Sequence, residues 1–505
     1  MSKRYLLGLD NGGTVVKAAL YDIEGNMLAC ARAGIRTILG ASGEVERDMA
    51  ALFAANCAVL REVVEQACID RADILGVSVS GHGNGLYLVD ADGQPVREGI
   101  YSTDLRAKAF IRRLEETGVS QSMFEKTMLL AYAGQPGPLL HHLQQSEPDA
   151  VLKAQWALGC NDYIRFCLTG TAFAELTNAS AAGVLNQRTQ LYEDSLFAAM
   201  EIPGCMRLFP PLLPSNGICG VVSARAAQES GLSEGTPVAG GMIDITACAI
   251  AAGIVDDTKL CLIAGTWSIN EYITKEPPLA RELLLASVYC IDGYYLVADG
   301  SMTSAGNLEW FVQEFLQAER AEMQAQGKTV YDAANALVAS VAPEEEGVVF
   351  LPFLYGANVE GDFRACFLGL SGRHNKTHML RAIYEGIAFS HRMHVERLLR
   401  YRDRPQAVRI AGGAGKSEIW VQIFADVLQM PVEVTAGEEL GAMGAAMCAG
   451  VAAGAYASMQ EAAEVFTKIS YVCAPDGTKK TLYERKYAFY QKAIGCLASL
   501  WTEDA

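Results

Sequence analysis

Two short segments of the same design constrain the fold of this chain more than any other feature. Residues 6–22 (LLGLDNGGTVVKAALYD) and 258–274 (TKLCLIAGTWSINEYIT) each run from an apolar strand through glycine and threonine into a second apolar strand. Glycine lets backbone N–H groups approach an anion closely, and the threonine hydroxyl adds another donor. Each segment alone is compatible with an ordinary β-hairpin. As a pair, separated by half of the chain, they predict a duplicated fold that grips the phosphates of one nucleotide from two sides.

Asp10 lies at the tip of the first strand, just before the glycines of the first hairpin. A carboxylate at this point suits Mg²⁺ better than it suits a bare phosphate, because Mg²⁺ in nucleotide sites is held by one or two carboxylates together with phosphate oxygens. We therefore expect Asp10 to be the residue linked to the metal.

The size and charge of the chain narrow the classes of function. A single hydrophobic core rarely supports 505 residues, so two domains are expected, and a hydrophobic content of 51% is enough to pack both. The 41 Lys and Arg residues against 58 Asp and Glu residues give a net charge of −17, without a basic stripe or an acidic tail. Nucleic acid and anionic membranes are therefore poor candidate partners.

The cysteines and the apolar segments bear on location. The fourteen cysteines are scattered singly and form no C-x-x-C pair, so neither a zinc site nor a disulfide framework is expected, and a reducing cytoplasm fits. The apolar stretch after MSKR ends at Asp10, so we expect no secretory signal. The uncharged stretch 440–459 is mostly Ala and Gly, which supply little transfer energy. A buried helix packed through small residues is favoured there over a membrane span.

Apolar strand-like runs alternate with helical patterns in both halves, which predicts an α/β fold with mostly parallel central pairing. A region rich in Pro and Gly, 203–223, precedes the expected boundary between an N-terminal domain, 1–243, and a C-terminal domain, 244–505. The last helical segment, 479–501, is long enough to pack back on the first domain. The expected strands are 5–9, 16–21, 75–79, 85–89, 258–263, 269–273, 294–298 and 407–411, and the other expected helices are 48–68, 305–325, 328–341, 376–400 and 417–429.

Asp244 follows Gly240-Gly241 and opens a helical run, ITACAIAAG. An aspartate there is compatible with a simple helix N-cap. Its place just before the second hairpin favours a chemical role, because an ionised carboxylate beside a bound γ-phosphate can take the proton of a hydroxyl acceptor, as an aspartate does in protein kinases. Asp244 is the candidate general base.

A glycine-rich turn is the candidate site for a polyol. Within residues 76–90, GVSVSGHGNGLYLVD, three glycines leave little side-chain bulk, and His82 and Asn84 offer hydrogen bonds. A structural histidine, satisfied within its own turn, is the alternative. Farther along, Asp104 and Arg106 add an acid and a base that are suited to hold sugar hydroxyls.

The string IAGGAGKSEIW at 410–420 imitates a P-loop, but Ile410 stands where that motif requires glycine. The Gly412-Gly413 turn, between a strand and a helix, is better suited to let adenine and ribose lie against the backbone. The spaced glycines of the 76–90 segment are not a dinucleotide fingerprint, because a strand and not a helix follows them.

With these residues assembled, the chain resembles the FGGY carbohydrate kinases, sugar-phosphorylating members of the actin and hexokinase superfamily, over nearly its whole length. The residues that fit the signature of the family's second domain, at its spacing, are Ala365, Phe367, Gly369, Leu370, His378, Met379, Ala382, Ile383, Tyr384 and Glu385. The resemblance implies a duplicated actin/hexokinase-like (ribonuclease H-like) two-domain α/β fold with an interdomain cleft. It also implies phosphoryl transfer from Mg²⁺-ATP, held between the two domains, to a terminal hydroxyl of a small sugar.

Carried over residue by residue, the family pattern makes Asp10 the Mg²⁺-linked carboxylate and Asp244 the base. The substrate contacts expected from the pattern and from the turns described above are His82, Gly83, Asn84, Asp104 and Asp244. The residues expected near the nucleotide and its phosphates are Asn11, Gly12, Gly13, Thr14, Lys17, Gly265, Thr266, Gly306, Gly412, Gly413, Ala414 and Ser417.

Departures from the family pattern bear on the substrate. Residues 135–148, QPGPLLHHLQQSEP, have neither the lysine nor the tryptophan usual in the family's first signature. Glycerol kinases carry Arg-Glu, and common D-xylulose kinases Met-His, where Gly83 and Asn84 stand. The tracts GNGLYLVD, GNLEWF and LPFLYGAN look most like L-xylulose kinases, which also act on the keto-sugar acid 3-keto-L-gulonate, and next most like erythritol kinases. The resemblance therefore implies a ketopentose such as L-xylulose, with erythritol, D-xylulose and glycerol as alternatives.

A nucleotide-driven switch of the same superfamily, such as an actin-like filament former or a chaperone ATPase, is the alternative from another class. The polar turn at 80–84 and the second-domain signature count against it. A ligand-binding regulator that lost catalysis is expected to lack Asp10 or Asp244, and both are present. The expected partner is therefore a small-molecule sugar, with neither nucleic acid nor a membrane, and a homodimer is the assembly to be considered.

Overall fold

The computed structural model describes residues 4–265, 267–302, 304–345, 347–356 and 363–501, and the chain separates into two compact units. The first unit is built from Met1–Val255, Ile273–Val297 and Gly437–Lys468, and the second from Asp256–Tyr272, Ala298–Ala436 and Ile469–Ala505. The units are therefore not two successive halves of the chain. The boundary expected at 243/244 falls at the start of a first-unit helix, and a late segment returns to the first unit.

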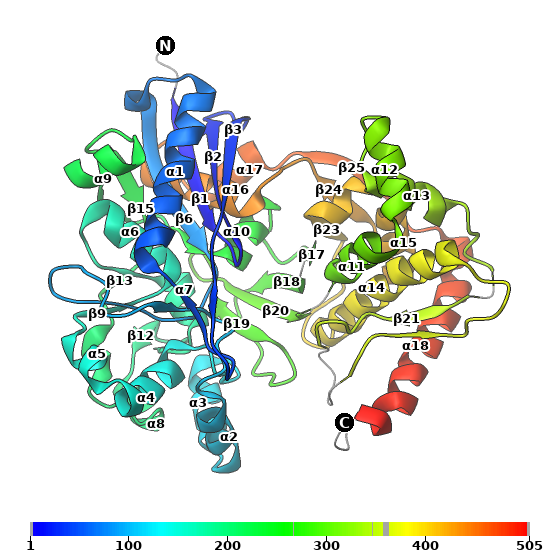
Figure 1. Ribbon diagram of the computed structural model, residues 1–505, viewed down its shortest axis with the longest axis horizontal. Coiled ribbons are helices and arrows are strands. Elements are labelled where there is room, and N and C mark those ends of the chain that lie inside the picture. Colours follow the sequence, from blue (N-terminus) through cyan, green and yellow to red (C-terminus); the bar gives the residue numbers. More distant parts are fainter. Residues whose placement is uncertain (1–3, 266, 303, 346, 357–362, 502–505) are drawn as a thin grey trace. The chain divides into compact units, whose positions relative to one another are not determined.

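A mixed sheet forms the centre of the first unit (Figure 1). Its strand order is β14-β15-β6-β1-β2-β3, and β16 also pairs with β6. β1 pairs antiparallel with β2 and parallel with β6. The bounds of these strands are Tyr5–Asn11 (β1), Val15–Asp22 (β2), Met27–Gly34 (β3), Ile74–Gly81 (β6), Ile218–Val221 (β14), Pro237–Ala239 (β15) and Met242–Ile243 (β16).

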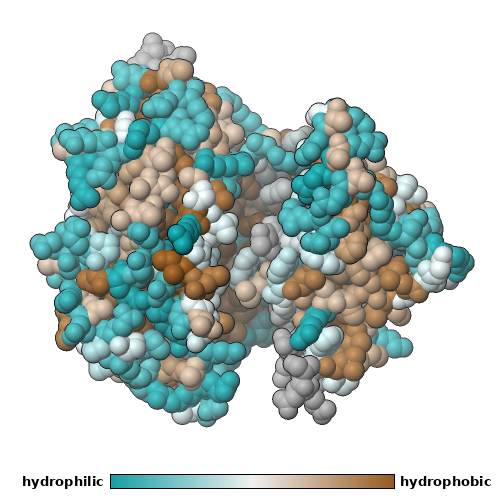
Figure 2. Space-filling model, in the orientation of Figure 1, coloured by the Kyte–Doolittle hydropathy of each residue, from teal (hydrophilic) through white to brown (hydrophobic). Residues whose placement is uncertain are grey.

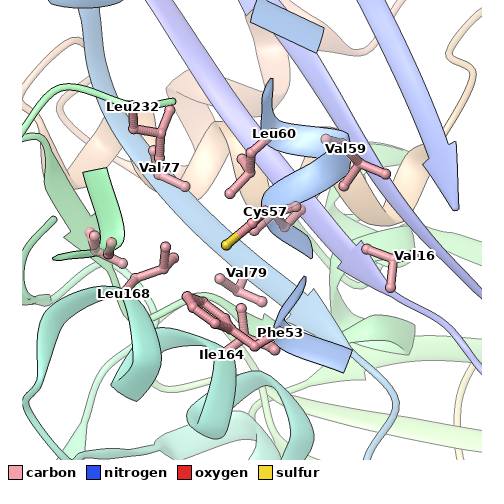
Figure 3. Close-up of a cluster of buried hydrophobic side chains, with 14 of the residues drawn as sticks. Val16, Phe53, Cys57, Val59, Leu60, Val77, Val79, Ile164, Leu168 and Leu232 are labelled. Carbon is pink, nitrogen blue, oxygen red and sulfur yellow. The ribbon is translucent and has the colours of Figure 1, made fainter. Parts of the chain in front are cut away.

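The core of the first unit lies between this sheet and two helices, α1 (Met49–Ala67) and α6 (Cys160–Thr169). Figure 3 shows Val77 and Val79 of β6 beside Leu60 of α1 and Ile164 of α6, all of them buried. Asp48 caps the N-terminus of α1 by accepting the Ala51 N–H at 2.9 Å, and Cys68 ends the helix in a left-handed conformation. The helix expected over 48–68 is therefore confirmed, and the structure places its two caps at the ends of that range.

The uncharged Ala- and Gly-rich stretch forms α16 (Leu440–Ala452), a buried helix of the first unit. It packs on β1, β6 and α10 (Asp244–Ala251). The approach is so close that a Cβ at Gly8 would lie 1.8 Å from the Ala442 carbonyl oxygen, and one at Gly444 would lie 2.3 Å from that of Ala247. The expected packing through small residues is confirmed. Within the described ranges, no helix has both the length and the apolarity needed to cross a membrane.

The second unit repeats the plan of the first around β17 (Lys259–Ala264), β18 (Ser268–Thr274) and β23 (Ala407–Ala411). β17 pairs antiparallel with β18 and parallel with β23, as β1 does with β2 and β6. In the second unit the strand order is β18-β17-β23-β24-β25, with β24 Val432–Thr435 and β25 Ile469–Cys473. Of the two further strands, β19 (Leu285–Val288) and the start of β20 (Tyr295–Ser301) fall within the residues of the first unit. The shared strand order confirms the predicted duplication of an actin/hexokinase-like α/β fold.

The last helix, α18 (Lys480–Trp501), packs on α14 (Lys376–Leu398), α15 (Glu418–Leu428) and β21 (Val349–Leu351) of the second unit, in place of the first-domain packing that its length suggested. The reason is aromatic: its buried tyrosines, Tyr483, Tyr487 and Tyr490, lie with ring centroids 5.5 to 6.4 Å from that of Phe389 on α14.

Two expected elements are shorter than predicted. The helix expected over 305–325 breaks at Leu316 into α11 (Gly306–Phe315) and α12 (Gln317–Ala325). The strand expected over 85–89 is reduced to β7 (Tyr87–Val89), because Gly85 has a φ of +77° and its N–H bonds the Gly134 carbonyl.

In the view of Figure 2, hydrophobic residues appear among a largely hydrophilic surface of the first unit, which is usual for a folded protein.

The remaining elements surround these two sheets. The other strands are β4 Ile38–Leu39, β5 Val45–Arg47, β8 Gly99–Ile100, β9 Trp156–Leu158, β10 Ala174–Glu175, β11 Leu185–Asn186, β12 Leu191–Tyr192, β13 Leu212–Leu213 and β22 Cys366–Leu368. The other α-helices are α2 Lys108–Glu116, α3 Val119–Thr127, α4 Pro136–Ser146, α5 Pro148–Lys153, α7 Leu176–Ala181, α8 Asp194–Ala199, α9 Ala224–Ser230, α13 Val330–Ala339 and α17 Met459–Phe466, with short 3-10 turns at Arg71–Asp73, Cys205–Leu208, Gly413–Lys416 and Gly477–Lys479.

The close contact between β1 and α16 predicts how a side chain at Gly8 changes the free energy of unfolding. Gly8→Ala should lower the free energy of unfolding by about 3 kcal/mol, because the new methyl group overlaps the backbone of α16 and the helix must move. Gly34→Ala, in β3 of the same sheet, is the control, since a Cβ there meets no described atom within 4 Å. Urea unfolding of both variants measures the difference, and equal midpoints would contradict the packing.

Candidate functional site

The carboxyl ends of neighbouring strands carry the candidate residues of the first unit. β1 and β16 both pair parallel with β6, so that Asp10 lies opposite Ser80 and Ile243 lies opposite Gly81. Asp244 begins α10 directly after β16. Ligands of open α/β sheets bind at this edge. The sheet therefore gathers Asp10, the turn at 82–84 and Asp244, which are far apart in the sequence.

Burial and the charge of Asp10 both oppose the ionisation of Asp244. Burial raises the pKa of Asp244, and the charge of Asp10 raises it further, to about 7. Burial also raises the pKa of Asp10, although Lys17 and the Ser80 hydroxyl, 3.3 Å from Oδ1, act in the opposite direction. The Asp244 carboxylate accepts the N–H of Ile245 at 2.8 Å. A nearby cation would stabilise the ionised form of both carboxylates.

The two carboxylates fit a Mg²⁺ ion that is bound mostly through phosphate oxygens and water. Across the described ranges, no cluster of three or more His, Cys, Asp or Glu side chains forms a dedicated metal cage. Mg²⁺ that accompanies a nucleotide needs only one or two carboxylates from the protein. Asp10 is therefore suited to the metal role expected of it.

A chain of hydrogen bonds from Glu175 through Thr177 to Ile243 holds the start of α10, where Asp244 lies. The buried Glu175 caps α7 by accepting the N–H groups of Thr177 and Asn178, each at 2.9 Å, and the Thr177 hydroxyl at 2.7 Å. The same Thr177 hydroxyl accepts the N–H of Ile243 at 3.0 Å. The residue before Asp244 is thus fixed to α7, and with it the direction in which Asp244 leaves the sheet.

The first hairpin has the expected form, with the Gly12 N–H donating to the Val15 carbonyl at 3.2 Å. Gly13 cannot carry a side chain, because a Cβ there would lie 2.5 Å from the Tyr101 hydroxyl. Thr14 is exposed at the tip. Lys17 is held near Asp10 by an ion pair of 2.8 Å with Glu439, which raises its pKa although burial lowers it.

Asn11 has a different role from the expected nucleotide contact. Its side chain is fully buried and forms a reciprocal amide pair with Asn56 of α1, at 3.1 and 2.8 Å. Both ends of the amide are therefore occupied by the protein. Asn11 braces the end of β1 against α1, and its backbone carbonyl accepts the N–H of His82 at 3.0 Å.

His82 is engaged on both ring nitrogens by its own protein. Nε2 accepts from Arg47 and from the Tyr87 hydroxyl, each at 3.3 Å, and Nδ1 therefore carries the proton and donates to the Gly83 carbonyl at 3.1 Å. Burial and the Arg47 charge lower the pKa of His82 to about 3. The ring is neutral near pH 7, and its nitrogens match the structural alternative and not the sugar contact.

The space beside the turn glycines is only partly free. A Cβ at Gly83 would lie 2.4 Å from Cδ1 of Ile243. The space beside this glycine is therefore filled by the Ile243 side chain, from the strand just before Asp244. Asn84 has a left-handed backbone, with a φ of 63°, and its side chain bonds Tyr132. Among the residues that the structure describes, the buried Oδ1 atom of Asn84 has no hydrogen-bond partner.

Asp104 is fully buried and fully engaged. Its carboxylate accepts the Val45 N–H at 2.7 Å and two guanidinium N–H groups of Arg106 at 2.9 Å. Arg106 also pairs with Glu46 at 2.6 Å. The acid and base expected to hold sugar hydroxyls instead hold each other, and they fix the 101–106 loop against β5.

Arg47 and Tyr101 also belong to the site, although no pattern in the sequence points to either residue. The Arg47 guanidinium is fully buried, donates to the Gly13 carbonyl and to His82, and lies 4.0 Å from the centre of the Tyr101 ring. No ion pair within the described ranges includes it. Arg47 stands between two acidic residues, in GEVERD, and so has the sequence pattern of an ordinary solvated charge. Only the fold shows that it joins the first glycine hairpin to the turn at 82–84.

In the second unit, the carboxyl ends of β17 and β23 bring the expected nucleotide residues together. Ile263 lies opposite Ala411, so Gly265 and Gly412 follow neighbouring parallel strands. The Ala305 N–H donates to the Gly265 carbonyl at 2.8 Å, which brings Gly306 to the same edge. Gly412 and Gly413 are exposed, and a Cβ at either would meet no described atom within 4 Å.

Other residues expected near the nucleotide are differently placed. Ala414 is buried, and the Ser417 hydroxyl is occupied, since it donates to Asn335 at 2.7 Å and caps α15 by accepting the Trp420 N–H. Both side chains therefore shape the turn from within. Thr266 lies outside the described residues.

The two domains of one protein family match two successive segments of this chain. Residues 5–251 match the N-terminal domain of the FGGY family of carbohydrate kinases, and residues 260–453 match its C-terminal domain. A protein of Pasteurella multocida described as a probable L-xylulose kinase is 34% identical over 498 residues, which cover 98% of this chain and 99% of that protein. The L-xylulose/3-keto-L-gulonate kinase of Escherichia coli is 34% identical over 496 residues, or 98% and 97% of the two chains. A crystal structure of xylulose kinase from Rhodospirillum rubrum superposes with a TM-score of 0.86 at 26% identity, covering 98% of this chain and 99% of its own.

The raised pKa of Asp244 makes the metal-free protein sensitive to pH. The folded protein holds this proton up to about pH 7, whereas the ordinary value is 3.8, so stability falls as pH rises through this window, by up to about 4 kcal/mol. Asp244→Asn removes the penalty. The variant should be more stable than the parent at pH 8 and similar to it at pH 4.5, in thermal melts with chelator and without nucleotide. Asp149→Asn, at an exposed carboxylate, is the control, and a pH-independent difference for Asp244→Asn would contradict the shift.

Proposed function

The chain belongs to the FGGY family of carbohydrate kinases and is an ATP-dependent sugar kinase, and we propose that its substrate is L-xylulose, phosphorylated at a terminal hydroxyl with Asp244 as general base. The observation that carries the proposal is the pairing of Asp244 with Asp10 at one sheet edge, beside the first phosphate hairpin. A base and a metal-linked carboxylate at one edge suit phosphoryl transfer to an alcohol.

The identity of the sugar is supported by the relatives and by the turn at 82–84. Two relatives that match almost the full length are named for L-xylulose, and one of these also for 3-keto-L-gulonate. Gly83 and Asn84 replace the Arg-Glu pair of glycerol kinases and the Met-His pair of common D-xylulose kinases. A ketopentose is therefore proposed ahead of erythritol, D-xylulose and glycerol.

In the proposed mechanism, Asp244 accepts the proton of the attacking hydroxyl as its oxygen bonds to the γ-phosphorus and the bond to the β–γ bridging oxygen breaks, so that ADP leaves. A pKa of about 7 suits a base that works near neutral pH. The Thr177 hydroxyl keeps Asp244 in place through the Ile243 N–H. Mg²⁺, bound with ATP and held through Asp10, would supply charge neutralisation at the phosphates.

The nucleotide is proposed to bind through exposed backbone. Gly12, Gly13 and Thr14 would face phosphate from the first unit, and Gly265 with Gly306 from the second. The open Gly412-Gly413 turn would accommodate adenine and ribose. The fourteen free thiols are compatible with the proposed cytoplasmic location.

A substrate panel tests the proposal. The protein with ATP and Mg²⁺ is assayed for ADP release with L-xylulose, 3-keto-L-gulonate, D-xylulose, erythritol and glycerol, and we expect the highest kcat/KM for L-xylulose. Asp244→Asn should lower kcat by about 10²- to 10⁴-fold while ATP binding stays nearly unchanged, because only the proton acceptor is lost. Turnover near that of the parent would remove Asp244 from the mechanism. ATP hydrolysis at the same rate with and without sugar would favour a switch or chaperone ATPase.

Asp10→Asn should act through the metal. We expect a loss of kcat/KM that depends on the identity and concentration of the divalent ion, because the variant weakens placement of the metal and not proton transfer. Titrations with Mg²⁺ and Mn²⁺ measure this dependence. The same loss with both ions at saturation, together with normal binding of metal-ATP, would contradict the metal role of Asp10.

A further inference from the structure

A small cavity of about 30 Å³ lies in the first unit beside the turn at 82–84. Its polar wall includes Asn84, Asp162 and Asn178, and its apolar wall includes Ala182 and Val184. A space of this size holds one small group, such as a hydroxymethyl group or a water molecule. No residue of the cavity other than Asn84 was expected to take part in function.

Two buried amide oxygens at this cavity lack partners. Oδ1 of Asn178 and Oδ1 of Asn84 accept no hydrogen bond from any described residue, and Asn178 is only 3% exposed. A buried oxygen without a partner is costly, and folded proteins contain few of them. The pair of oxygens therefore indicates that a hydrogen-bond donor enters the cavity.

The orientation of the Asn178 amide is fixed by its neighbours. Its Nδ2 donates to Oδ1 of Asn161 at 2.9 Å and faces Oδ2 of Asp162 at 3.4 Å, and both are acceptors, so the nitrogen cannot exchange places with the oxygen. Oδ1 is thus turned toward the glycine turn, where a Cβ on Gly83 would come within 3.8 Å of it. The unpaired acceptor points at the turn where the sugar is proposed to bind.

The cavity is also tied to the general base. Thr177, the neighbour of Asn178, accepts the N–H of Ile243, and Ile243 packs against Gly83 and precedes Asp244. The start of α10, and with it Asp244, is therefore held by the same helix, α7, that carries Asn178. The small, partly apolar space suits a carbon bearing one hydroxyl group.

We propose that this cavity is the subsite for the end of the sugar farthest from the reacting hydroxyl, with Oδ1 of Asn178 and Oδ1 of Asn84 accepting hydrogen bonds from substrate hydroxyl groups. The inference rests on the proposed function and narrows it. The oxygens are acceptors only, so the subsite suits hydroxyl donors at the neutral end of a ketose and offers no matching partner to the carboxylate of a keto-sugar acid. It therefore selects L-xylulose over 3-keto-L-gulonate.

The test compares L-xylulose with L-erythrulose, a ketose that is one carbon shorter, in the parent protein, Asn178→Ala and Asn84→Ala. We expect each variant to lower kcat/KM for L-xylulose by about 10- to 100-fold and for L-erythrulose by less than about 3-fold, because the shorter sugar does not fill the subsite. The parent should also prefer L-xylulose over 3-keto-L-gulonate by at least about 10-fold. Asn186→Ala removes a hydrogen bond to Glu193 outside the cavity wall. It is the control for a general structural defect, which would lower kcat/KM for both ketoses equally.

Three results would overturn the proposal: equal losses for the two ketoses in Asn178→Ala and Asn84→Ala, no loss for either ketose, which would assign the cavity to a water molecule, or equal use of the keto-sugar acid. Urea unfolding establishes that each variant is folded. If Asn178→Ala does not fold, the comparison of the two ketoses in Asn84→Ala tests the proposal alone. If the panel shows another preferred sugar, the same comparison is made with that sugar and its analogue one carbon shorter. A wrong substrate in the proposed function is thereby distinguished from a wrong role for the cavity.

Discussion

The close contact of α16 with β1 and α10 is the constraint on which the first unit depends. Gly8 and Gly444 leave no room for a side chain, so the helix backbone lies directly on the strand and on α10, which begins with Asp244. At the same contact, a Cβ on Gly441 would lie 2.6 Å from the Asp10 carboxylate, and the Ser80 hydroxyl bonds the Gly441 carbonyl at 2.9 Å. A segment from the end of the chain therefore closes the floor of the site around Asp10. The glycines of α16 are needed for this geometry, although they lower helix propensity.

The site is built from charges that the protein does not fully compensate. Burial and the charge of Asp10 raise the pKa of Asp244, and Arg47 is a buried cation with no ion pair among the described residues. Such groups persist only where the surrounding packing holds them, and they are typical of functional sites. Arg47 also keeps His82 neutral and ties it to the backbone of Gly13. Arg47 thus connects the first glycine hairpin and the turn at 82–84 within one unit.

Several side chains that looked functional in the sequence are supports. Asn11 pairs with Asn56, Asp104 pairs with Arg106, and both nitrogens of His82 are used within the protein. Their residue types are those of ligand contacts, and the sequence could not show that a partner elsewhere satisfies them. The reverse holds for Asn178, whose side chain lies on an ordinary short helix and yet presents an unpaired oxygen. Burial makes the difference in each case, because a polar group withdrawn from water must find a partner in the protein or in a ligand.

The sequence by itself determined the features that depend on near neighbours along the chain. These include the two glycine hairpins, the helix over 48–68, the buried Ala- and Gly-rich helix and the aspartate that opens α10, because periodicity and turn residues act over a few residues. Only the tertiary structure decided which polar groups meet, as with Arg47 and His82, and that α18 packs on the second unit. It also decided that residues 437–468 return to the first unit. Such pairings depend on where distant segments lie, and many polar residues of one sequence are chemically equivalent candidates until the backbone brings two of them together.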